Sequence, residues 1–503
     1  MKRRLAYGSA IGLLIAGVAV AVAQLVAAFV SDVASPVVAV GQAAIDLAPP
    51  PVKDFAINTF GSHDKLALLT GIGVLLALFA VAIGVLAVQT RWTAYAGLAL
   101  FGAVGLAAAL TRPGAGQLAV LPSIVGVAAA FGALQLLFNT QRTEDISPTG
   151  FDRRRFLVTG GALGAGAVAV GFASRLAGAS GRKATASRAA LRIPKPAEPA
   201  PPVPSGVDLN VRELSSFYTP NSSFYRVDTA IVAPKIRAAD WKLRIHGMVD
   251  RPIEMNIDQL LARPLIERDI TIACVSNEIG GPYVGNARWI GARLKPILEE
   301  AGVHPKADQL VSRSADGCTI GTPTAVVMDG RDAMLAVAMN GEPLPIKHGF
   351  PVRMIVPGLY GYVSATKWVV DMELTTFDAF DAYWIPRGWA KKAPIKTMSR
   401  IDTPSAAVKP GKVPVAGVAW AQHKGIERVE VQIDDGPWRE ARLSALDTID
   451  TWRQWVYEWD ATPGSHVIRA RATDKTGYMQ TSDDASPAPD GATGWHTVTI
   501  SVV

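Results

Sequence analysis

Cys274 has the clearest potential for chemistry in this 503-residue chain, because it ends a short apolar run and opens the glycine-rich loop CVSNEIGGPYVGNARWIG. A thiolate can bind a soft metal or act as a nucleophile. Neither Cys274 nor Cys318, the other cysteine, stands in a CxxC or HxxxH spacing that would complete a zinc site. The residues alone leave two alternatives open: a metal centre with a single thiolate ligand, or a cysteine nucleophile.

Three further stretches carry cationic and polar groups. They are TPNSSFYR, which ends in Tyr225 and Arg226; SADG, which contains Asp316; and HGFPVRMIVPGLYGYVSATKW, which contains His348, Arg353 and Lys367. Taken singly, each residue has an ordinary structural explanation, such as a buried histidine, a surface ion pair or an Asp-Gly turn. Those explanations do not account for the whole set in this order and spacing.

These stretches resemble the sulfite oxidase family of molybdopterin-dependent oxidoreductases, and the resemblance covers nearly all of residues 206–503. HGFPVR, the KW pair after the VPG turn, and NARW after the cysteine match the family pattern. The resemblance implies that Cys274 binds molybdenum and that Cys274 and Arg226 act in catalysis. It also implies contacts with the molybdopterin by Asn221, Tyr225, Arg226, Asp316, His348, Arg353, Ser364, Ala365, Thr366 and Lys367. The terminal phosphate of such a cofactor suits cationic donors, above all arginine.

The loop departs from the sulfite-oxidising members of that family directly after the cysteine. Those members continue with Asn and two arginines, whereas this chain has Asn277 followed by Glu278 and Ile279. A carboxylate near the pocket disfavours a dianion such as sulfite. We therefore expect oxygen-atom transfer at molybdenum on a small sulfur or other oxo-compound, with sulfite oxidation and sulfoxide reduction both open.

Two hypotheses from other classes remain. The first is a non-catalytic, membrane-anchored binding or sensing module with a degenerate cofactor domain; the intact cysteine and cations argue against it. The second is a thiol enzyme that uses Cys274 as nucleophile. It lacks an evident base, because His246 and His304 stand in ordinary strand and loop contexts.

Four long apolar runs come first in the chain. They are Tyr7–Val30, Leu66–Val88, Thr93–Leu110 and Leu118–Phe138. About 20 helical residues cross a hydrocarbon core of about 30 Å, so each run is long enough to span a membrane. The sequence therefore predicts a four-helix transmembrane region over residues 1–150. No charged residue and no histidine interrupts these spans, which favours an anchor over a transporter and excludes a bis-histidine haem within them.

A fifth, weaker apolar run, Phe156–Gly178, follows the sequence RRRFL at residues 153–157. Within the segment 151–179, this pattern favours a twin-arginine export signal over arginines that merely anchor one more helix. Together with the basic residues 2–4 before the first span, it predicts a multi-pass protein of the cell membrane. The part after about residue 180 is then extracytoplasmic.

Three segments are expected after these helices: a Pro/Ala-rich linker over 180–205, a mixed α/β molybdopterin domain over 206–404, and an all-β domain over 405–503. In the α/β domain, Leu243 and Ile245 alternate with polar residues as in a strand. In the last domain, Val429, Val431 and Ile433 alternate in the same way. Several short strands over about 100 residues suggest an immunoglobulin-like sandwich, which similar family members often use for dimerisation.

The composition bears on cofactors and partners. A net charge of +7 without a basic block argues against nucleic-acid binding. CxxCH and iron–sulfur spacings are absent, so we expect molybdenum-molybdopterin as cofactor and no haem or iron–sulfur centre in this chain. The expected partners are a small oxo-substrate, a separate cytochrome or quinone-linked electron partner, the membrane, and a second copy of the chain through the C-terminal domain.

Overall fold

The computed structural model describes residues 2–30, 34–49, 64–111, 117–139, 153–177 and 179–503, together with positions 52, 55, 59 and 60. The chain forms two units: Met1–Thr185 with Thr229–Lys235, and Ala186–Asp228 with Ile236–Val503. The short segment Thr229–Lys235 was expected in the molybdopterin domain, but it groups with the helical unit.

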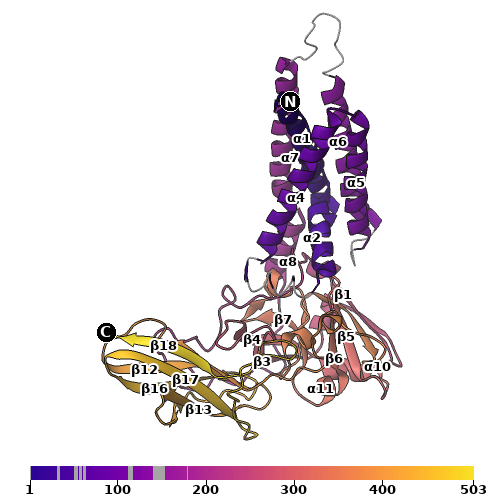
Figure 1. Ribbon diagram of the computed structural model, residues 1–503. Helices are drawn as coiled ribbons and strands as arrows, with labels where there is room; N and C mark the ends of the chain where they lie inside the picture. Colours follow the sequence, from indigo (N-terminus) through magenta and orange to yellow (C-terminus); the bar gives the residue numbers. More distant parts are fainter. Residues whose placement is uncertain are drawn as a thin grey trace, which may run out of the picture. The chain divides into compact units, whose positions relative to one another are not determined.

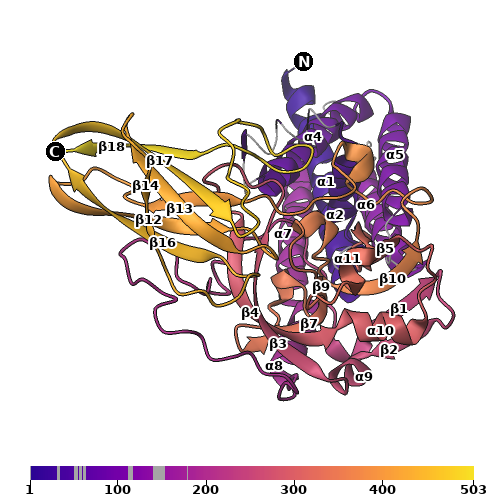
Figure 2. The same ribbon diagram turned by 90° about the horizontal axis from the view of Figure 1, so that it is seen from below.

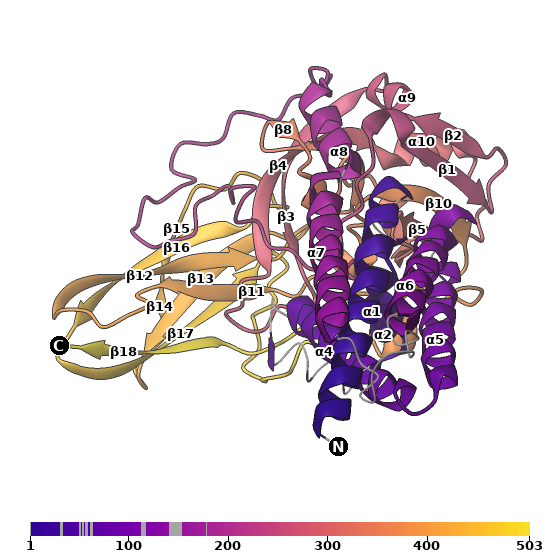
Figure 3. The ribbon, with the colours of Figure 1, turned by 90° about the horizontal axis from the view of Figure 1, so that it is seen from above.

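Long charge-free runs of Ala, Leu, Val and Gly form the helices of the first unit, because a helix satisfies its backbone groups internally. The helices are α1 (Lys2–Val30), α2 (Pro36–Leu47), α4 (Asp64–Ala87), α5 (Arg91–Leu110), η3 (Gln117–Val120), α6 (Leu121–Asn139), α7 (Arg153–Ala177) and α8 (Ala179–Ala190). Figure 1 shows α1, α4, α5, α6 and α7 side by side, and Figure 3 shows α1 between α6 and α7.

Within the described residues, four helical segments are long and apolar enough to cross a membrane: Leu5–Val30, Lys65–Ala87, Arg91–Leu110 and Leu118–Phe138. They correspond to the four predicted runs. The apolar part of α7, Leu157–Ala173, is shorter. The arginine side chains of RRRFL lie outside the part of the chain whose side chains are described.

Small residues let the helices approach closely. A Cβ at Gly12 of α1 would collide with the carbonyl oxygen of Ala80 on α4. The two backbones are therefore in direct contact, as is common where glycines face each other in membrane helices.

Two helices of this region were not predicted. The 12-residue helix α2 is too short to span a membrane; the Ser35 side chain caps it and Pro36 occupies its first turn. Helix α8 occupies the first part of the predicted 180–205 linker. Its sequence holds Ala and Arg without proline, so the Pro-rich composition that favours an extended chain begins only after it.

Two sheets form the α/β part of the second unit. The first has the order β2 (Ile253–Asn256), β1 (Lys242–Gly247), β10 (Val369–Thr375), β5 (Gln309–Ser314) and β6 (Thr319–Pro323). The second has the order β3 (Leu265–Ala273), β4 (Val284–Arg293), β7 (Met334–Met339) and β8 (Glu342–Pro343), with β9 (Arg353–Ile355) also paired to β7. Of these pairs, only β1 with β10 is parallel. The intervening short helices are η4 (Ala238–Asp240), α9 (Ile257–Leu261), α10 (Leu294–Ala301), α11 (Thr324–Met328), η5 (Ile346–His348), η6 (Gly361–Val363) and η7 (Ile385–Arg387).

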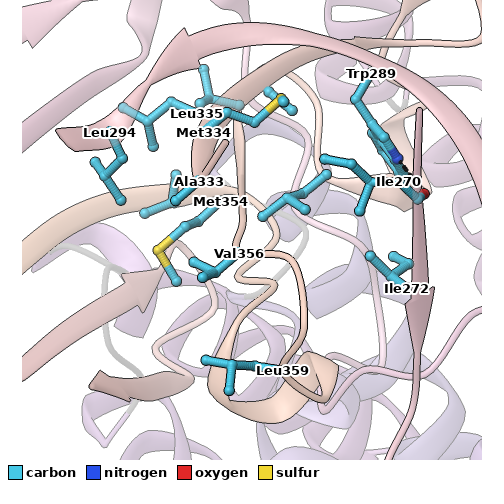
Figure 4. Packing of buried hydrophobic residues seen from close by; sticks show 14 of the residues in the cluster. Ile270, Ile272, Trp289, Leu294, Ala333, Met334, Leu335, Met354, Val356 and Leu359 are labelled. Carbon is cyan, nitrogen blue, oxygen red and sulfur yellow. Dashed lines mark hydrogen bonds between the residues drawn. The ribbon is translucent and has the colours of Figure 1, made fainter. Parts of the chain in front are cut away.

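The core of this part lies around β7. All residues of its run MLAVAM are buried, as is typical of a strand covered on both faces. Figure 4 shows Met334 and Leu335 of β7 packed with Met354 of β9 and Leu294 of α10. Trp289 of β4 is buried in the same cluster. This core fixes the ends of β3, β4 and β9, where the candidate site residues lie.

The C-terminal part is all-β, as predicted. One sheet has the order β11 (Met398–Thr403), β12 (Gly411–Trp420), β16 (Arg453–Ala461) and β15 (Arg442–Leu443); the other has the order β14 (Arg439–Glu440), β13 (Ile426–Ile433), β17 (Gly464–Asp474) and β18 (His496–Val502). Figure 2 shows the strands of both sheets together, and one buried cluster contains residues of both, including Val415 and Val429. Since β11 pairs with β12, this part begins several residues before the predicted boundary at 405.

Candidate functional site

Cys274 directly follows β3, and the loop it opens is closed at its base. The Cys274 N–H donates to the Tyr283 carbonyl (2.9 Å), and the Asn277 side-chain oxygen accepts from the Tyr283 N–H (2.7 Å). The thiol is buried, with 9% of the residue exposed. Burial raises its pKa, while hydrogen bonds with Ser276 and the charge of Lys367 act in the opposite direction. The thiol is therefore set to lose its proton when a metal cation binds rather than in the free protein.

Arg353 and His348 form a deeply buried pair beside this loop. Arg353 is 4% exposed, its guanidinium lies 5.1 Å from the Trp289 ring centre, and its Nη1 donates to the His348 carbonyl (3.2 Å). Burial lowers the pKa of Arg353 to about 10. The pKa of His348 falls to about 3, first because of burial and then because of Arg353 and Lys367. At neutral pH the pair therefore consists of a charged guanidinium and a neutral imidazole.

Two polar atoms of this pair are unsatisfied. His348 Nε2 and Arg353 Nε are buried and have no hydrogen-bond partner in the described part of the chain. Buried polar atoms without partners are costly, so two of them on side chains of one contacting pair indicate a ligand with polar groups. A phosphate or a pterin edge has such groups, and the two side chains fit either.

Lys367 and Arg226 share one buried carboxylate. Lys367 Nζ donates to Asp228 Oδ2 (2.9 Å) and to the Val227 carbonyl (2.9 Å), while Arg226 Nε donates to Asp228 Oδ2 (2.7 Å). The Asp228 side chain is only 4% exposed. Asp228 was not predicted as a site residue; a carboxylate two positions after Arg226 was the only signal for it in the sequence.

The charge of Cys274 affects the pKa values of two buried tyrosines, Tyr225 and Tyr360. Tyr225 stacks on Phe224, with ring centres 5.3 Å apart. Burial raises its pKa, and so does a negative charge on Cys274. The pKa of Tyr360 is raised by burial, with a smaller contribution from Cys274. Both phenols therefore keep their protons at neutral pH. Tyr360 was not predicted.

The segment Ser364–Lys367 shapes the wall of the site mainly through its backbone. The Ser364 hydroxyl donates to the carbonyls of Leu359 and Tyr360, both at 2.9 Å. The Ala365 N–H donates to the Gly361 carbonyl (2.9 Å). The Thr366 hydroxyl bonds to that of Ser312. The Ser364 hydroxyl thus stabilises the loop itself, the Thr366 hydroxyl joins the loop to β5, and Lys367 supplies a positive charge.

The Asn221 backbone forms a hydrogen bond with His348, and its side chain holds a neighbouring turn. Its amide donates to the Met339 carbonyl (3.1 Å) and to Glu342 Oε1 (2.6 Å), and its oxygen accepts from Asn340 (2.9 Å). These bonds use most of its capacity to hold the β7–β8 turn. Asp316 lies in the turn between β5 and β6, where its carboxylate accepts from the Cys318 N–H (3.2 Å). Cys318 is partly buried.

Glu278 and Ile279 occupy the positions at which sulfite-oxidising members of the family have arginines. Neither is as deeply buried as Arg353. Glu278 is exposed. Ile279 lies against Gly494, where a Cβ would collide with it. Arg400 of β11 donates to the Gly281 carbonyl (2.8 Å), so the C-terminal sheets hold the far end of the cysteine loop.

The structure thus brings Cys274, Tyr225, His348, Arg353 and Lys367 together, and links Arg226 to them through Asp228. Among the described residues, no three His, Cys, Asp or Glu side chains are grouped as metal ligands. A metal here would have one thiolate from the protein, with its other ligands supplied by a cofactor.

The chain is similar to known proteins over this region. The family model described as oxidoreductase molybdopterin binding domain matches residues 230–384. Mitochondrial sulfite oxidase of Drosophila melanogaster is 30% identical over 52% of this chain and 55% of its own length. The human enzyme is 26% identical over 57% of this chain and 62% of its own length. The chain thus spans little more than half the length of these relatives.

Two further matches cover most of the other protein. The uncharacterized oxidoreductase YuiH of Bacillus subtilis is 33% identical over 30% of this chain and 72% of its own length. The crystal structure of the sulfane dehydrogenase SoxCD from Paracoccus pantotrophus matches with a TM-score of 0.50 and 26% identity, covering 57% of this chain and 82% of that one.

Proposed function

Because the chain belongs to the sulfite oxidase family of molybdopterin-dependent oxidoreductases, we propose that it is a membrane-anchored enzyme that transfers an oxygen atom to or from a small oxo-compound. The observation that carries this proposal is the convergence of one buried thiol with a buried arginine and a buried histidine whose side chains each hold an atom without a partner. A buried thiol, arginine or histidine occurs singly in many protein cores, but the three together suit a phosphorylated cofactor that carries a metal.

Each residue has a role that follows from its surroundings. Cys274 would bind molybdenum, and His348, Arg353 and Lys367 would hold the polar and anionic groups of the molybdopterin. When bound, this cofactor supplies the exchange of an oxygen atom and two electrons. Tyr225 keeps its phenolic proton and would donate a hydrogen bond within the site. The loop Ser364–Lys367 would fix the cofactor by its backbone, with Asn221 and Asp316 supporting the surrounding turns.

A carboxylate in the cysteine loop disfavours a dianion as substrate. Glu278 stands where sulfite-oxidising members have an arginine, while Asp228 offsets one of the two positive charges of Arg226 and Lys367. Reduction of a sulfoxide is therefore a second candidate reaction beside oxidation of sulfite. Arg226, with 36% of its side chain exposed, is the cation best placed to bind an anionic substrate.

We also propose the cellular arrangement. The four apolar helices would span the cell membrane, and the RRRFL segment would direct the second unit out of the cytoplasm. The C-terminal sheets would form an immunoglobulin-like sandwich that pairs two copies of the chain. A separate cytochrome or a quinone would exchange electrons with the molybdenum centre.

The test is the metal and pterin content of the full chain, purified from a host that makes the cofactor. We expect about one molybdenum per chain with a releasable fluorescent pterin, and loss of molybdenum in Cys274→Ser with the β-sheets still folded. Turnover by Cys274→Ser, or a wild-type protein without metal and pterin, would contradict the proposal. A screen of sulfite against dimethyl sulfoxide then separates the two candidate reactions.

A further inference from the structure

The helical unit contains an apolar crevice that an anchor does not need. Two cavities lie between its helices, and they share Ala19 of α1, Leu76 of α4 and Phe101 of α5. Together they follow α1 from residue 11 to residue 23. At 1.5 Å per residue, the two cavities, which we call the crevice, extend along about 18 Å of α1. A linear apolar chain fits such a shape.

Small residues open the crevice, and none of the described residues that line it is charged. Gly97, Gly102 and Gly105 of α5 and Gly126 of α6 contribute to its wall. The described lining residues are apolar or glycine except one, Ser123. A charged lipid headgroup therefore has no counter-charge from these residues along the crevice.

Ser123 is the polar end of the crevice. It lies in the first turn of α6 and is 5% exposed, and its hydroxyl has no hydrogen-bond partner among the described residues. The hydroxyl faces Gly105, where a Cβ would lie 3.0 Å from Ser123 Oγ. Serine hydroxyls within helices usually bond to a carbonyl one turn earlier. A buried hydroxyl without that bond indicates an acceptor supplied by a ligand.

We propose that this crevice binds an isoprenoid quinone. A ring carbonyl would accept the hydrogen bond of Ser123, and the prenyl chain would lie between α1, α4 and α5. A phospholipid fits less well, because its phosphate finds no cation among the described lining residues. A quinone has one neutral polar head and a long apolar tail, as the crevice requires.

The redox role of this ligand rests on the proposed function, whereas its binding does not. Oxidation of a substrate with water as the oxygen source releases two electrons and two protons. Reduction of a quinone to a quinol takes up two electrons and two protons. The two half-reactions balance without a further oxidant, so the helical unit would bind the electron acceptor of the enzyme.

The test is photolabelling of the full chain in phosphatidylcholine nanodiscs with an azido-quinone. We expect labelled peptides from α1, α5 and α6, protection by decylubiquinone, and no protection by added phosphatidylglycerol. Ser123→Ala removes one hydrogen bond and should weaken decylubiquinone binding about fivefold to tenfold. Gly102→Leu, whose Cβ would lie 2.9 Å from Val127 Cγ2 and so displace this part of the crevice wall, should abolish labelling.

Gly73→Leu is the matched control. Gly73 is an exposed glycine of α4 at which an added Cβ would have no neighbouring atom within 4 Å, and it does not line the crevice. Its labelling should equal that of the wild type. Labelling outside the crevice, displacement by phosphatidylglycerol, or wild-type affinity in Ser123→Ala and Gly102→Leu would overturn the inference. Since labelling needs no turnover, an active enzyme without labelling would refute quinone binding alone, and a labelled but inactive protein would refute only the redox role.

Discussion

The cations beside Cys274 differ in how their charge is balanced. Arg353 is buried without a carboxylate partner among the described residues, whereas Lys367 and Arg226 share Asp228. A loaded cofactor would balance the first through its phosphate. Asp228 offsets one of the two positive charges of the second pair, so it sets both the stability of this wall and the charge that a substrate meets.

Removal of that carboxylate tests this role. Asp228→Asn should destabilise the protein by about 3 kcal/mol, because it leaves a buried lysine unpaired. This corresponds to a fall of roughly 6–10 °C in the midpoint of thermal unfolding, followed by tryptophan fluorescence. Asp240→Asn removes the partner of Arg237 in a pair that is about half exposed, and it should cost less than about 1 kcal/mol. Equal effects of the two substitutions would contradict the role of Asp228.

His348 should make the stability of the cofactor-free protein depend on pH. In the folded protein its pKa is about 3, against 6.5 for an ordinary histidine, chiefly because of burial. Below about pH 6.5 the unfolded chain therefore binds a proton that the folded protein does not. The stability contribution is complete above pH 6.5 and is lost as the pH falls toward 3, by up to about 1.4 kcal/mol per pH unit.

The difference between wild type and His348→Gln isolates this proton. In urea titrations between pH 4 and pH 6.5, the substitution should reduce the slope of unfolding free energy against pH by nearly one proton. His304→Gln, at an exposed position, should leave the slope unchanged. An unchanged slope in His348→Gln would mean that the imidazole is not held neutral by its surroundings.

At the scale of elements, the cysteine loop depends on strands far away in the sequence. A Cβ at Gly280 would collide with the His496 ring at the start of β18, and the Nδ1 of that ring accepts from the Ile401 N–H of β11 (2.9 Å). The ring is therefore fixed by two strands of the C-terminal sheets. Through this contact the C-terminal sheets support the loop that carries Cys274.

A pair of glycine substitutions separates this contact from simple backbone strain. Gly280 and Gly330 both have positive φ, at 74° and 101°, but nothing lies within 4 Å of a Cβ at Gly330. Each change to Ala should cost about 1–2 kcal/mol of strain. Gly280→Ala alone should also displace the loop and lower molybdenum content several-fold, measured by metal analysis. Comparable loss of molybdenum in Gly330→Ala would contradict this assignment.

The sequence predicted those features that depend on local pattern. The apolar runs predicted α1, α4, α5 and α6 because their length and lack of charge are visible along the chain, and the alternation of Val429 and Val431 predicted β13. The sequence did not predict which polar side chains pair with each other inside the folded protein. The pairing of Asp228 depends on two residues, of which Lys367 is 139 positions away, and the bonds of Asn221 depend on a distant turn. Such contacts leave no periodic signal in a single sequence.

At the scale of the whole molecule, the sequence predicts on which side of the membrane the second unit lies. The RRRFL pattern predicts export of the second unit after its cofactor has been inserted. If it is an export signal, changing Arg153 and Arg154 together to Lys should leave the second unit inside the cell. In spheroplasts, added protease should then no longer digest the C-terminal sheets. Arg91→Lys, a matched change at the first residue of α5, should leave their digestion unchanged. Normal digestion in the double variant would reduce the arginines to membrane anchors, since lysine serves that purpose equally well.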